Sequence, residues 1–91
     1  MGNSDLDQYT EAQLNAMHSA VSADAVTHFE ASLAITREAG TLGLDRYGMD
    51  RYRELMTEAD LRQAAGRERQ ELATSIHAEC ARREAVRASG A

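Results

Sequence analysis

Apolar residues recur at three- and four-residue spacing in two long segments, which flank a short stretch containing two glycines. In the first segment, one stripe of a helical wheel collects Leu14, Met17, Val21, Ala25, Phe29 and Ile35, with Val26 and Leu33 widening one side. In the second segment, the corresponding stripe collects Tyr52, Leu55, Ala59, Ala65, Leu72, Ala73, Ile76 and Cys80. This spacing predicts an all-α antiparallel hairpin with helices over about residues 10–39 and 45–88.

Helix boundaries are marked by capping residues. Thr10 and Gln13 have the spacing of a capping box, in which each side chain bonds the other residue's backbone N–H group. Gly40 is expected to end the first helix in a left-handed conformation. Asp45 or Asp50 is expected to cap the second helix. Residues 10–88 would then form a single domain, with a flexible arm over 1–9 and a disordered tail over 89–91.

The middle of the second segment is the weakest part of the pattern. Arg62, Gly66 and Arg69 interrupt its apolar stripe. A glycine inside a helix costs about 1 kcal/mol relative to alanine. Gly66 therefore marks either a kink, a close helix crossing or a division into two shorter helices.

Folding the chain back over residues 40–44 predicts which residues face each other. We expect Leu14 near Ala73, His18 near Arg69, Asp24 near Arg62 or Gln63, and His28 near Ala59. Each helix of an isolated pair has a single neighbour, so part of each stripe stays uncovered. We expect the chain to dimerise with itself into a four-helix bundle.

The composition indicates a thin core. Alanine supplies 17 of the 39 hydrophobic residues, and each alanine buries little apolar area. A chain of 91 residues also has an unfavourable ratio of surface to volume. Both features favour self-association and binding to a larger protein.

The number of cysteines and the hydropathy of the sequence indicate the cellular compartment in which the protein is expected. Cys80 is the single cysteine, which excludes an internal disulfide and indicates a reducing environment. The sequence contains no apolar run that could span a bilayer and no start resembling a signal peptide. We expect a cytoplasmic protein that does not bind membranes.

Charge is distributed unevenly along the chain. Residues 1–45 carry seven acids against Arg37, a net charge of −6, whereas residues 46–91 carry nine arginines against eight acids, a net charge of +1. Opposite excesses favour antiparallel pairing of the two segments. The total of −5 argues against a nucleic-acid-binding protein, which would be expected to carry a basic surface.

A first group of candidate site residues lies close to the helix interface. It comprises His18, Asp24, His28, Ser32, Arg62 and Arg69. Asp24 and Ser32 lie one turn on either side of His28, so a carboxylate could orient this imidazole and a hydroxyl could bond it. Without an identifiable nucleophile or oxyanion donor beside it, we favour a buried polar cluster over a catalytic site.

A second candidate is a metal site on the second helix. His77, Cys80 and Glu84 share one helical face, and their side chains are suitable ligands for zinc or iron. A second His/Cys pair, or the repeated Glu-x-x-His of di-iron bundles, is missing from the sequence. We therefore expect no cofactor, and keep metal binding as an alternative.

Residues 57–76 offer a further alternative. Leu61, Ala65 and Gly66 give this stretch a pattern that resembles the helix-turn-helix of Cro-type repressors. Arg62 and Arg67 depart from the pattern, because they occupy positions where small or apolar residues pack between the two helices. The resemblance implies a DNA-binding regulator.

The start of the second helix carries the candidate partner-binding residues Arg46, Tyr47, Arg51, Tyr52 and Arg53. Arginine and tyrosine are enriched in interaction hot spots. The alternative is that Tyr52 packs in the core while the arginines pair with nearby acids. We expect a non-enzymatic adaptor, regulator or accessory subunit that acts through helix-to-helix contacts.

Overall fold

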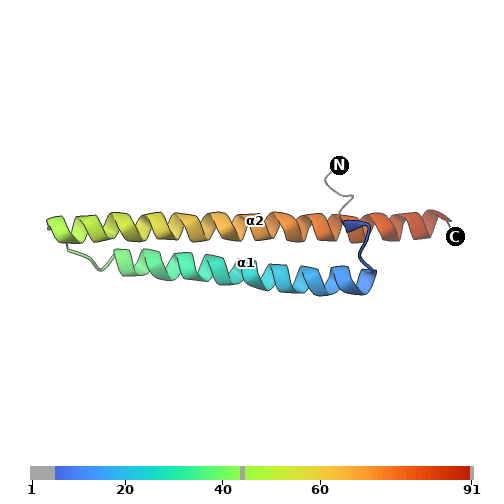
Figure 1. Cartoon of the computed structure of the whole chain (residues 1–91), viewed down its shortest axis with the longest axis horizontal. Coiled ribbons are helices and arrows are strands. Elements are labelled where there is room, and N and C mark those ends of the chain that lie inside the picture. The colour runs from blue at the N-terminus through green and yellow to red at the C-terminus, as the bar shows by residue number, and fades with distance from the viewer. Residues whose placement is uncertain (1–5, 44, 91) are drawn as a thin grey trace.

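The protein is a helical hairpin. The computed structural model describes residues 6–43 and 45–90, and within these ranges it contains two helices and no strand. Helix α1 spans Glu11–Ala39 and helix α2 spans Arg46–Gly90. The two helices lie side by side and antiparallel, and α2 extends past α1 at both ends (Figure 1). The predicted fold class is confirmed.

Capping side chains define where both helices begin. The Thr10 hydroxyl accepts a bond from the Gln13 backbone N–H at 3.1 Å, and the Gln13 side chain accepts from the Thr10 N–H at 2.8 Å. This confirms the predicted capping box. The Asp45 carboxylate accepts from the Gly48 N–H at 2.7 Å, so Asp45 rather than Asp50 caps α2.

The end of α1 differs from the prediction. Gly40 has a φ of −67° and a ψ of −13°, a right-handed conformation, so the expected left-handed glycine is wrong. Thr41 explains the difference, because its backbone N–H and its hydroxyl both donate to the Glu38 carbonyl, at 3.0 and 2.7 Å. The terminal carbonyls of α1 thus find donors without a left-handed residue.

Helix α2 continues without a break through Gly66, and the two helices approach closely there. A Cβ atom on Gly66 would lie 2.8 Å from the Phe29 ring, so glycine makes room for that ring. Ala25 and Ala59 are buried nearby, and the Ser32 hydroxyl donates to the Ala59 carbonyl at 2.9 Å. Of the three alternatives for Gly66, the close crossing is the one the structure adopts.

The helices pair in a different register from the one predicted. Asp24 forms an ion pair with Arg69, two turns beyond the expected Arg62 or Gln63. Ser32, one turn after the expected His28, lies against Ala59. The bend explains the shift, because α2 begins beyond the end of α1 instead of level with it (Figure 1).

The segment before α1 also packs on the hairpin. Residues 1–5 of the predicted flexible arm and Ala91 of the predicted tail lie outside the described residues. Leu6, however, is 7% exposed and forms a core cluster with Leu14 and Ile76, against which Tyr9 packs. These apolar side chains cover one side of the helix pair near the start of α1. At the other terminus, α2 includes Ser89 and Gly90.

The molecule is elongated, measuring 68 × 22 × 17 Å with a radius of gyration of 19.2 Å. A compact domain of this length has a radius of gyration of about 12 Å. Neither described helix contains an apolar stretch long enough to cross a membrane. Most residues thus touch a single neighbouring helix, which agrees with the thin core expected from the composition.

Candidate interaction surface

The bend carries the predicted arginine and tyrosine residues on the first turns of α2. Tyr47 is 80% exposed. Arg51 pairs with Glu54 at 3.1 Å, and Arg53 pairs with Asp50 at 3.8 Å, both along the surface of the same helix. Such exposed pairs contribute at most about 1 kcal/mol and exchange readily for other partners.

Two further residues of this group differ in their surroundings. Arg46 makes no ion pair with any residue that the structure describes. Tyr52 is 40% exposed and is therefore not packed in the core, which was the alternative for this residue. The bend thus presents phenol rings and cationic side chains together to solvent.

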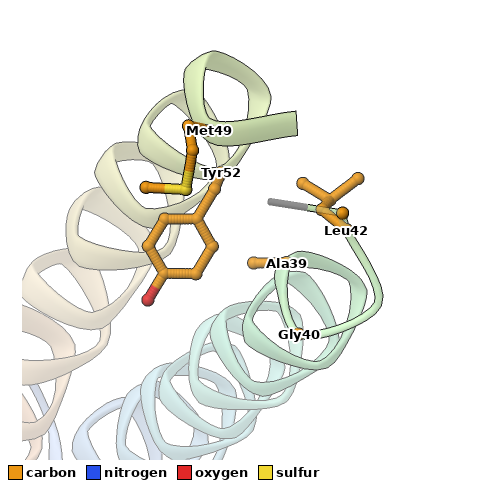
Figure 2. A pocket seen from close by; sticks show the side chains of 6 residues that line it. Ala39, Gly40, Leu42, Met49 and Tyr52 are labelled. Atoms are coloured by element: carbon orange, nitrogen blue, oxygen red, sulfur yellow. The ribbon is translucent and has the colours of Figure 1, made fainter. Parts of the chain in front are cut away.

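A hollow of about 380 Å³ lies beside Tyr52, between the end of α1 and the start of α2. It is lined by Ala39, Gly40, Leu42, Gly43, Met49 and Tyr52. In Figure 2, the Met49 and Tyr52 side chains extend from α2 into the space that Leu42 and Ala39 border. The sequence prediction missed Leu42 and Met49, although the spacing of Met49 and Tyr52 already places them on one helical face.

The same side of the hairpin continues as a row of exposed apolar residues. Two more hollows, of about 310 and 230 Å³, lie along it and share Phe29. We call this side the neutral edge and define it by Ser22, Val26, Phe29, Leu33, Thr36, Met49, Tyr52, Gln63 and Gln70. The α1 members are spaced by three or four residues, so they share one helical face. None of the residues lining the three hollows carries a charge.

The opposite side of the helix pair holds the charged contacts. Asp24 and Val26 are two residues apart and therefore point about 200° apart around α1. Asp24 forms an ion pair with Arg69 at 2.9 Å, and its carboxylate lies 3.6 Å from the His28 Nε2 atom. We call Asp24, His28 and Arg69 the charged edge. It brings together three members of the predicted polar cluster.

The remaining members of that cluster lie elsewhere. Ser32 bonds the Ala59 carbonyl instead of His28, whose Nδ1 atom is buried and has no partner among the described residues. Arg62 is exposed and forms no ion pair within the described part of the chain. His18 lies beside His77 rather than Arg69, with ring centroids 6.2 Å apart.

The predicted metal-binding side chains do not converge. Cys80 packs against the core formed by Leu6, Leu14 and Ile76. No group of three or more His, Cys, Asp and Glu side chains in the described ranges is placed to hold a metal ion. His77, Cys80 and Glu84 share a helix face, but they do not form a three-ligand site.

Residues 57–76 form one uninterrupted stretch of α2. The turn that separates the two helices of a Cro-type motif is therefore missing from this stretch. Arg62 and Gly66, which marked the departure and the turn in the sequence comparison, both lie within regular helix. The helix-turn-helix expectation for this segment is wrong as a structural prediction.

A buried ionic cluster near the chain termini was not predicted at all. Glu79 is 2% exposed, and its carboxylate accepts from Arg82 at 2.6 and 3.0 Å and from Arg83 at 2.7 Å. Hydrogen bonds from Arg82 and Arg83 lower the pKa of Glu79 to about 2. Arg83 also donates to the Leu6 carbonyl at 3.0 Å, and Arg82 reaches Asp7 at 3.4 Å. We call Glu79, Arg82, Arg83, Leu6 and Asp7 the carboxylate clamp.

The clamp has a sequence signal, because Arg82 and Arg83 follow Glu79 by three and four residues. Ion pairs from Arg82 to Asp7, Arg69 to Asp24 and Arg87 to Glu11 join the two oppositely charged segments. They agree with the antiparallel pairing expected from the charge distribution.

Comparison of the chain with protein-family models, with curated proteins and with solved structures finds no match.

Proposed function

We propose that this protein is a small non-enzymatic adaptor, regulator or accessory subunit that acts through helix-to-helix contacts with a second copy and with a larger protein. The neutral edge is the observation that carries the proposal. Val26 and Leu33 are 53% and 50% exposed there, and each lines one of the two hollows that share Phe29. Exposed apolar rows of this kind mark interaction sites.

The amount of exposed surface supports self-association. The chain exposes 6618 Å². A compact monomer of 10.0 kDa would expose about 5,200 Å². The difference, roughly 1,400 Å², exceeds the ~800 Å² that each partner buries in a standard interface. Covering the part of the neutral edge around Val26, Phe29 and Leu33 with the same part of a second hairpin would bring the surface towards the range of compact proteins and leave Met49 and Tyr52 exposed at the bend.

The chemistry of the neutral edge also suits a second copy. A two-fold interface places equivalent residues close together, and like charges at such positions would repel each other. The side chains that line the hollows are apolar or uncharged polar groups, so no such repulsion arises. Two hairpins joined in this way form the four-helix bundle that the sequence pattern favours.

The bend is the surface proposed for the larger partner. Tyr47, Tyr52 and Met49 supply exposed apolar area beside the 380 Å³ hollow. Arg46 adds a cationic group without an ion pair among the described residues, and the exposed pairs of Arg51 and Arg53 with Glu54 and Asp50 can open to bind an acidic partner. A helix with apolar anchors and acidic flanks fits this combination. The lack of charged groups in the hollows supports a binding role over a catalytic one, and the single cysteine supports a cytoplasmic location.

The test of self-association is the mass in solution of the full chain at tens of micromolar. We expect a dimer of about twice 10.0 kDa by light scattering. The double substitution Val26→Glu with Leu33→Glu places two charges on the neutral edge of each copy, and we expect it to give monomers. Because both side chains are half exposed, the hairpin should keep its helical content by circular dichroism.

Leu61→Glu is the matched control. Leu61 is 67% exposed and lies two residues from Gln63, so it points away from the neutral edge. We expect this variant to remain a dimer. A monomeric unmodified chain, or a double variant that keeps the mass of a dimer, would show that the neutral edge is not a self-association surface.

A further inference from the structure

Two histidines face each other across the helix pair. His18 on α1 and His77 on α2 have ring centroids 6.2 Å apart and ring planes inclined at 48°. His18 is half-buried and His77 is exposed, so both rings are accessible from solvent. Neither ring hydrogen-bonds or forms an ion pair within the described residues. Their ring nitrogens are therefore available as ligands.

We propose that His18 and His77 together bind a divalent transition metal ion, with Zn²⁺ as the probe. Zinc binds imidazole nitrogen at about 2.0–2.1 Å, so two imidazoles on one tetrahedral ion have centroids roughly 5–6 Å apart. The separation in the structure is 6.2 Å. A small rotation of the two side chains brings both nitrogens within bonding distance of one ion.

One turn along each helix from the two histidines, the sequence places no charged residue. The residues one turn away from His18 are Leu14, Asn15, Val21 and Ser22, and those one turn away from His77 are Ala73, Thr74, Cys80 and Ala81. No cationic side chain stands at these positions to repel an ion. Water would fill the remaining coordination positions, because Cys80 is packed against Leu14 and Ile76 in the core.

Bound metal would join α1 to α2. A ligand that binds the folded chain and not the unfolded chain raises the stability of the fold. The site lies on the helix pair itself and needs neither the second copy nor the larger protein. Metal binding is therefore independent of the proposed function, and either can fail without the other.

The experiment is a titration of the EDTA-treated full chain with ZnCl₂ near neutral pH, followed by calorimetry and by thermal unfolding. We expect one ion per chain and an unfolding temperature raised by several degrees at saturating zinc. His18→Ala and His77→Ala should each weaken binding by at least about tenfold, because each removes one of two ligands. Binding should also weaken on acidification, since protons compete for the ring nitrogens.

His28→Ala is the matched control, because this histidine lies against Asp24 on the charged edge. We expect it, and Cys80→Ser, to bind zinc like the unmodified chain. His18→Gln and His77→Gln repeat the test with polar side chains, and circular dichroism verifies that each variant is folded. No zinc binding by the unmodified chain, full affinity in a folded His18 or His77 variant, or loss of binding in the His28 or Cys80 variant would overturn the proposal.

Discussion

The two ends of the hairpin are built from the same kinds of helix but differ in how they are closed. Near the termini, Leu14 and Ile76 are completely buried beneath Leu6. At the bend, Tyr47 is 80% exposed and a hollow of about 380 Å³ remains between the helices. The terminal end therefore buries two large side chains beneath a third segment, whereas the bend buries Leu55 but also leaves apolar surface available for contact.

The difference arises from the number of chain segments that meet at each end. At the terminal end, the segment before α1 packs on both helices, and the carboxylate clamp fixes its backbone through Arg83 and Leu6. At the bend, no third segment of the described ranges lies against the two helices (Figure 1). The hairpin buries Leu14 and Ile76 beneath a third segment, whereas Leu55 nearer the bend is 2% exposed in the helix interface alone.

The largest expected effect is therefore loss of a large core side chain at the terminal end. Ile76→Ala should lower the free energy of unfolding by about 2–5 kcal/mol, because Ile76 is 0% exposed and its removal leaves a cavity. Leu42→Ala at the bend is the comparison, and we expect a loss below about 1 kcal/mol for this partly exposed side chain. Urea unfolding at one fixed protein concentration measures both. Equal losses would remove the distinction between the ends.

The second-largest expected effect is a loss of stability on acidification, which arises at the terminal end of the hairpin. The folded chain holds the pKa of Glu79 at about 2, below its ordinary value of 4.5. A lowered pKa stabilises the fold above pH 4.5, and this contribution is lost as the pH falls from 4.5 towards 2.

The acid test compares unfolding curves over this pH range. Glu79→Gln cannot ionise, so we expect it to be less stable than the unmodified chain at about pH 6 and to converge with it near pH 2. Glu54→Gln is the control, because Glu54 pairs with Arg51 near the bend. This pair is exposed and contributes little, so the control should leave the pH dependence of stability almost unchanged. Parallel pH profiles for the unmodified chain and Glu79→Gln would contradict a stabilising clamp.

The smallest expected effect on stability comes from replacing two glycines, Gly66 at the helix crossing and Gly40 at the bend. Gly66→Ala places a Cβ 2.8 Å from Phe29 and should cost about 1 kcal/mol, because overpacking exceeds the gain in helix propensity. Gly40→Ala meets nothing closer than 3.4 Å in a right-handed conformation and should be neutral or stabilising by up to about 1 kcal/mol. Thermal unfolding measures both, and a stabilising Gly66→Ala would show that Phe29 moves aside freely.

Local patterns predicted the helices but not their alignment. The apolar spacing and the Thr10 and Asp45 caps depend on neighbours within a few residues, and both helices begin within one residue of the expected positions. The register depends on how the bend joins the helices, and a shift of one or two turns keeps a similar apolar stripe in contact. For that reason the sequence placed His18 against Arg69 instead of His77.

For the candidate site residues too, the positions that depend on local sequence were predicted, and those that depend on helix alignment were not. The arginines and tyrosines at the start of α2 lie at the bend as expected, because that position follows from the hairpin alone. The hollow beside Met49 and Leu42 depends on how two helix ends are spaced, and Glu79 was overlooked because an acid in a helix is usually solvated. Its partner Arg83 also bonds the Leu6 carbonyl, a long-range contact that local sequence does not reveal.

Helix α2 also sets the length of the molecule. Its 45 residues extend about 68 Å at 1.5 Å per residue, which equals the longest dimension of the chain. Because the helix runs without a break from Arg46 to Gly90, it acts as a rigid spacer. Side chains at its opposite ends are therefore held at a nearly constant separation, and this separation is set by the number of residues in α2.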